Sequence, residues 1–305
     1  MKKLGALSNG ARVGLFGLGL GAAFAAAFLL GSAFDPAETG AGGSHQEGAA
    51  HGAAHERSEE AEMAAHGEHQ EAATAPGGLA VAADGYALRV DSTHLDADEP
   101  SELRFQIEGP GGEAVREFDR LHEREMHLIV VRRDGAHFQH LHPELAADGT
   151  WVAALTLPAA GVYRAFADFA VAGHDLTLAT DLFASGRFEA QPLPAPAALA
   201  TTAGYELRLE AAPLLAGQPA ELRFAVSRGG HEVAGLQDYL GAKGHLVALR
   251  EGDLAFLHVH PDAQEEAATI PFTAHFPTPG RYRLYLQFRH EGEVRTAEYT
   301  VAVRR

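Results

Sequence analysis

Two short histidine motifs are the clearest candidates for a chemical function in this chain. They are His140-Leu141-His142-Pro143 and His258-Val259-His260-Pro261, and corresponding residues lie 118 positions apart. Along an extended strand, residues i and i+2 point to the same face, so each motif directs two imidazole rings into one small volume. Imidazole nitrogens are ligands that copper and zinc accept. Each motif therefore predicts part of a metal site.

A third histidine precedes each pair by thirteen residues. We expect it at the start of the preceding strand, where a hairpin can bring its ring beside the other two. Three nitrogen ligands with one open position suit copper or zinc. The candidate ligands are thus His127, His140 and His142 in the first copy and His245, His258 and His260 in the second.

Supplementary ligands are available only in the first copy. These are Met126 and Asp168, and His122 and His174 are available as well. The second copy has Gly244 at the position of Met126 and Gln287 at the position of Asp168. The two predicted sites therefore need not be equivalent.

The histidine motifs belong to a longer internal repeat. Gly85–Arg89 (GYALR) matches Gly204–Arg208 (GYELR), and Glu102–Phe105 recurs as Glu221–Phe224. A ladder of matches in the same order indicates a duplicated structural unit.

The sequence between these motifs has the pattern of β-strands. Short apolar or alternating runs are separated by Gly, Pro and Asp clusters, and about seven such runs per copy fit an immunoglobulin-like β-sandwich. A Gly-x-Tyr-Arg element, at Gly161 and again at Gly280, resembles the tyrosine corner of such domains. We predict an all-β chain of two tandem immunoglobulin-like β-sandwich domains, at 79–190 and 201–305, joined by a Pro-rich linker at 191–200.

The N-terminal part has a different character. Positive residues precede an uncharged run at Val13–Phe34 that is long enough to cross a bilayer, so 1–34 is predicted to be a signal anchor or signal peptide. We expect a retained helix at the cell membrane with the bulk of the chain extracytoplasmic. Cleavage after Ala33 would instead give a secreted protein.

Residues 35–78 are rich in Ala, Gly, Glu and His and have few large apolar side chains, which predicts a disordered tether. The tether histidines could capture metal loosely, or the segment could be a solvated spacer.

Composition limits the possible functions. A chain of 305 residues with 46% hydrophobic content suits two domains. The absence of cysteine excludes disulfides, thiolate metal sites and cysteine nucleophiles. A net charge of −17 without a basic cluster argues against a nucleic-acid partner.

Three segments carry a family resemblance: Met126–Asp134, Phe138–Pro143 and Gly161–Phe169. They resemble bacterial secreted or membrane-anchored proteins with this histidine–proline signature, loosely similar to the YtkA-like and FixH-like extracytoplasmic β-sandwich modules. The resemblance covers 79–305 and implies copper or heavy-metal handling. It implies no catalytic residues.

Three functional interpretations follow. The main one is a non-enzymatic metal-binding protein, for copper or zinc, that acts in sequestration or delivery. In the second, the histidines are bonded to backbone carbonyls and the chain is a metal-free envelope scaffold or adhesion protein. In the third, Gly252, His258, His260 and Glu265 have the spacing of the first cupin motif and the chain is a two-cupin metal enzyme, although the first copy lacks this pattern.

Overall fold

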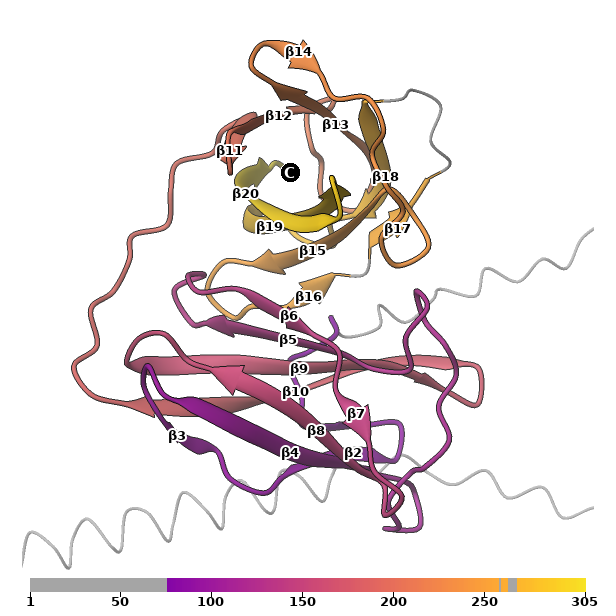
Figure 1. Ribbon diagram of the computed structural model, residues 1–305. Helices are drawn as coiled ribbons and strands as arrows, with labels where there is room; N and C mark the ends of the chain where they lie inside the picture. Colours follow the sequence, from indigo (N-terminus) through magenta and orange to yellow (C-terminus); the bar gives the residue numbers. More distant parts are fainter. Residues whose placement is uncertain (1–75, 258, 263–267) are drawn as a thin grey trace, which may run out of the picture. The chain divides into compact units, whose positions relative to one another are not determined.

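The computed structural model describes residues 76–257, 259–262 and 268–305 (Figure 1). The predicted anchor at 1–34 and most of the predicted tether lie outside the described residues. Within the described ranges the chain forms strands and no helix, which confirms the all-β prediction. A search of the same ranges finds no helix able to span a membrane.

The first repeat consists of two sheets. One has the order β1-β2-β4-β8-β7, and the other has the order β3-β10-β9-β5-β6. Neighbouring strands are antiparallel except β3 and β10, which are parallel. The strands of the first sheet are β1 (Ala82–Ala83), β2 (Tyr86–Val90), β4 (Pro100–Glu108), β8 (Thr150–Thr156) and β7 (Glu144–Leu145). Those of the second are β3 (His94–Asp96), β10 (His174–Ser185), β9 (Gly161–Val171), β5 (His127–Arg132) and β6 (Gln139–Leu141).

The second repeat has the same plan. Its first sheet has the order β11-β12-β13-β18-β17, with β14 paired to β13, and its second has the order β16-β15-β19-β20. The first sheet contains β11 (Leu199–Thr202), β12 (Tyr205–Glu210), β13 (Pro219–Arg228), β18 (Thr269–His275), β17 (Val259–Pro261) and β14 (His231–Glu232). The second contains β16 (Phe256–Leu257), β15 (Gly244–Arg250), β19 (Gly280–His290) and β20 (Glu293–Val303).

Each repeat encloses its own apolar core between its two sheets. Because side chains alternate across a strand, Leu128 and Val130 of β5 point into the first core, and Leu246 and Ala248 of β15 point into the second. The predicted tyrosine corner is present in both copies. The hydroxyl of Tyr163 donates to the carbonyl of Ala159 at 2.8 Å. These features define two immunoglobulin-like β-sandwiches.

The outer faces of β5 and β15 are covered as well. β5 is buried at every position, whereas an antiparallel strand with one face in solvent alternates between buried and exposed residues. Its outward residues Ile129 and Val131 share a buried apolar cluster with Val247 and Leu249 of β15. We call this contact the junction, and it joins the two repeats through their second sheets.

Polar contacts fix the segments that border the junction. The backbone NH of Phe256 in the second repeat donates to Gly77, while the NH of Gly78 donates to Thr177 in the first repeat, both at 2.9 Å. Gly78 has φ +71°, and a Cβ there would lie 2.5 Å from the ring of Phe166. Only glycine therefore fits at this position.

The connection between the repeats is also held in place. Residues 187–197 form no strand. The backbone NH of Gln191 donates to Oδ2 of Asp134 at 2.8 Å, and the NH of Ala197 donates to the carbonyl of Thr300 at 3.1 Å. The linker thus contacts both repeats.

The junction generates a stability prediction. Replacing Ile129, which is 0% exposed, with alanine removes apolar contacts on the outer face of β5 and should lower the free energy of unfolding by about 2–5 kcal/mol. Urea unfolding measures this change. Leu199→Ala is the control, because Leu199 is 47% exposed. Equal unfolding free energies for the two variants would show that the junction does not form.

Candidate metal centre

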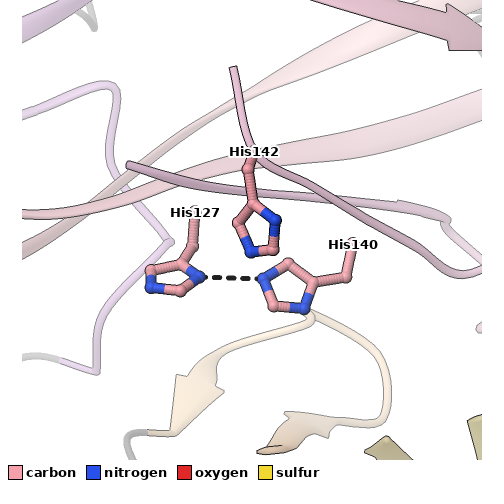
Figure 2. Close-up of side chains that lie close together, drawn as sticks. All are labelled: His127, His140 and His142. Carbon is pink, nitrogen blue, oxygen red and sulfur yellow. Dashed lines mark hydrogen bonds between the residues drawn. The ribbon is translucent and has the colours of Figure 1, made fainter. Parts of the chain in front are cut away.

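The three histidines of the first repeat converge on one volume (Figure 2). His127 begins β5, His140 lies in β6, and His142 follows it. Because Leu128 pairs with Leu141 in this antiparallel hairpin, the neighbouring residues His127 and His142 lie opposite each other. One nitrogen from each ring lies within 4.8 Å of the others. A β-hairpin thus positions the three rings, as the spacing of the motif predicts.

Hydrogen bonds determine which nitrogen of His127 and His140 carries the proton. Nε2 of His127 lies 2.8 Å from the carbonyl oxygen of Leu121, which can only accept, so Nε2 must donate. Nδ1 of His140 lies 2.6 Å from Oε1 of Gln287 and donates to it. In the neutral rings, Nδ1 of His127 and Nε2 of His140 are then left without a proton.

These two nitrogens lie 2.9 Å apart, which is the hydrogen-bond distance that the dashed line marks in Figure 2. A hydrogen bond between them requires one ring to carry protons on both nitrogens. Two nitrogens bound to one tetrahedral zinc ion at its usual bond length lie roughly 3.3 Å apart. The observed separation is therefore close to that of two ligands of a single ion.

Two further imidazole nitrogens have no hydrogen-bond partner in the part of the chain that the structure describes. They are the buried Nε2 of His142 and the buried Nδ1 of His245. A buried polar atom without a partner costs about 1–3 kcal/mol, so such atoms call for an explanation. A bound cation would provide one.

The electrostatics keep the rings neutral. Burial lowers the pKa of His127 to about 4, and the neighbouring charge of Asp168 opposes only part of this effect. Burial also lowers the pKa of His142 to about 4, with a further contribution from the Arg124 guanidinium. The pKa of His140 is lowered well below its usual value by burial and by the nearby rings. At neutral pH the lone pairs are available.

His245 lies beside this group, although it belongs to the second repeat. Its ring centroid is 4.5 Å from that of His140 and 5.5 Å from that of His127, in stacked orientation. The ring centroid of His122 lies 5.8 Å from that of His245. The sequence predicts that His245 belongs to a separate site in its own repeat. The structure places its ring beside the first-repeat histidines at the junction, because β5 and β15 present their outer faces to each other. Its predicted grouping with the other second-repeat histidines stays a prediction.

The supplementary candidates have different positions. Met126 is 1% exposed and packs in the core of the first repeat, on the opposite face of the chain from His127. Asp168 is the register partner of His127, and it accepts a 2.7 Å hydrogen bond from the hydroxyl of Thr177. His174 is exposed at the start of β10. Of these, Asp168 is the one whose charge acts on the histidine group.

The second predicted triad stays a prediction. His258 lies outside the described residues, and for His260 the structure describes the backbone, which pairs with Thr273 between β17 and β18. Glu265, which completes the cupin spacing, also lies outside the described residues. The cupin interpretation therefore stays a prediction as well.

Gln287 is a site residue that the sequence identifies only as the counterpart of Asp168. It is 7% exposed and reaches His140 from the other repeat. The continuous apolar run at 128–131, which indicates a strand buried on both faces, was the available signal that another surface covers β5.

A family model matches most of the chain. Residues 80–186 and 200–305 each match the family described as "Domain of unknown function (DUF8832)". The chain is therefore a tandem β-sandwich protein, and it belongs to this family, with two copies of the domain. The family description assigns no metal or activity, so the resemblance to YtkA-like and FixH-like modules stays a prediction.

Other comparisons concern the fold alone. The Escherichia coli adhesin FdeC is 14% identical over 73% of this chain and 65% of that chain, with a TM-score of 0.24. InvD of Yersinia pseudotuberculosis is 14% identical over 72% and 57%, also with a TM-score of 0.24. A Salmonella alpha-2-macroglobulin mutant is 14% identical over 75% and 15%, with a TM-score of 0.26. No curated protein matches the chain.

The lowered histidine pKa values predict how stability responds to acid. In the unfolded chain these rings titrate near 6.5, whereas His127 and His142 titrate at about 4 when folded. Between these values the unfolded state binds more protons, so the free energy of unfolding falls as pH drops from 6.5 toward 4. Urea unfolding of the metal-free protein at several pH values measures the slope.

The double variant His127→Gln/His142→Gln should reduce this slope, and His174→Gln, at an exposed position, should not. An unchanged slope in the double variant would show that these rings are not desolvated.

Proposed function

We propose that this chain is a non-catalytic, extracytoplasmic β-sandwich protein that binds a copper or zinc ion and serves in metal sequestration or delivery. One observation carries the proposal. Nδ1 of His127 and Nε2 of His140 lie 2.9 Å apart, beside the unpartnered Nε2 of His142, while the opposite nitrogens of the first two rings are held by Leu121 and Gln287.

The donor set favours borderline transition metals. Three neutral imidazoles suit copper and zinc, whereas magnesium and calcium prefer oxygen ligands. The chain has no cysteine, and Met126 is enclosed in the core of the first repeat. His140 and His142 are half-buried as residues, while Nε2 of His142 is itself buried. Exchange of the ion with solvent or a partner fits sequestration or delivery.

The location of the protein rests on the sequence of 1–34. A membrane anchor there would place both repeats outside the cytoplasm, where the histidines could meet metal ions entering the envelope. No protein partner is proposed.

A metal-free envelope scaffold or adhesion protein is the second candidate. The observation that favours it is the apolar junction, which holds the two sandwiches in one compact unit through buried hydrophobic side chains. In this candidate the bonds of His127 to Leu121 and of His140 to Gln287 serve only to hold the junction. Both candidates share the same coarser conclusion, a non-enzymatic tandem β-sandwich.

Metal titration separates the two candidates. The compact unit Gln70–Arg305 should bind copper or zinc in calorimetry and elemental analysis, and His140→Ala/His142→Ala should remove one ion per chain because two ligands are lost. His174→Ala is the matched control, since this ring is exposed and outside the group. If the wild-type fragment binds neither metal, the scaffold candidate is correct.

The pH dependence of binding distinguishes the folded site from loose histidine capture. Because the pKa of His127 and His142 is lowered to about 4, protons should compete with the ion at the folded site only as pH approaches that value. Loosely held histidines would lose metal near their ordinary pKa of about 6.5. Equilibrium dialysis of the full-length chain should therefore show one ion retained at pH 5.5. Complete loss of metal between pH 7 and 6 would contradict the folded site.

A further inference from the structure

Gln287 links the histidine group to the second repeat. It lies on the outward face of β19 as the register partner of His245, just as Asp168 is the register partner of His127. Its Oε1 accepts from Nδ1 of His140 at 2.6 Å, and its Nε2 lies 3.4 Å from the hydroxyl of Thr296. The amide oxygen, rather than its nitrogen, faces His140, and the nitrogen is directed toward Thr296.

The hydrogen bond from His140 to Gln287 selects between the two neutral tautomers of the His140 ring. With Gln287 as acceptor, the proton stays on Nδ1 and Nε2 presents a lone pair toward His127. Without it, the proton can move to Nε2 and form a hydrogen bond with Nδ1 of His127, which is already 2.9 Å away. That bond would occupy both nitrogens and leave neither available to a metal.

We propose that the metal site is shared between the two repeats, with Gln287 as the positioning residue that holds His140 in its metal-binding tautomer. This inference rests on the proposed function and deepens it. The first repeat supplies the three histidine ligands, and the second repeat supplies the acceptor that frees His140. Second-repeat residues also enclose the site, because the ring of His245 stacks on His140 with centroids 4.5 Å apart. Substitution of such a hydrogen-bond partner of a ligating histidine typically lowers metal affinity by about 10–100-fold.

Substitution of Gln287 tests the proposal in the full-length chain. Its five tether histidines, His45, His51, His55, His66 and His69, are changed to asparagine so that they do not take up the probe ion. The probe is Zn²⁺, and binding is followed at the ring signals of His140 in long-range ¹H–¹⁵N spectra, which also report its tautomer. Gln287→Leu should weaken zinc binding by about 10–100-fold and move the proton of metal-free His140 to Nε2.

Two matched variants separate positioning from packing. Gln287→Glu keeps an acceptor oxygen at this position and should preserve the Nδ1-protonated tautomer. Tyr285→Phe removes another bond across the junction, from the Tyr285 hydroxyl to the Gly135 carbonyl at 2.7 Å, without touching the histidines. It should leave both zinc affinity and tautomer unchanged. If Gln287→Leu does not fold, Gln287→Ala removes the same acceptor without a branched side chain.

The outcomes distinguish this inference from the proposed function. If wild-type protein binds zinc and the Gln287→Leu or Gln287→Ala variant binds it equally with the proton still on Nδ1, the shared site is wrong and the metal-binding proposal stands. If wild-type His140 shows no response to zinc or copper, the metal-binding proposal itself fails. A loss of affinity in Tyr285→Phe equal to that in Gln287→Leu would overturn the positioning role and assign the effect to packing.

Discussion

The burial of β5 against β15 is the contact on which the rest of the structure depends. It covers the outer face of a strand whose inner face already packs in the first core, so β5 is buried at every position. His127 is the first residue of this strand and is 1% exposed. Removal from water lowers its pKa and leaves its polar atoms dependent on protein partners. The chemistry of the site follows from this apolar contact.

The junction has equivalent strands from both repeats but unequal chemistry. His127 and His245 occupy corresponding positions, and their rings lie near each other. Their register partners differ, since Asp168 carries a charge and Gln287 is neutral. A carboxylate on one side stabilises positive charge near the rings, while the amide on the other side orients His140. The duplicated fold therefore supports one asymmetric histidine group in the described residues.

Local sequence patterns predicted much of this structure. The internal repeat follows from matching segments of the sequence. The strands, the tyrosine corner and the approach of His140 and His142 to His127 follow from residue spacing within one repeat. Strand alternation could also have placed Met126 in the core, because neighbouring residues point to opposite faces. The position of His245 was not predictable in this way. It depends on which sheet faces meet across the junction, and no spacing within one repeat encodes that contact.

Anomalous diffraction from crystals grown with copper or zinc would test the central claim most directly. We expect an ion about 2.0–2.1 Å from Nδ1 of His127 and Nε2 of His140, with His142 as a further ligand. The Leu121 carbonyl and the Gln287 amide should still accept from the opposite nitrogens. Metal-replete crystals with no anomalous peak at these rings, and with His127 and His140 joined by a hydrogen bond, would contradict the account.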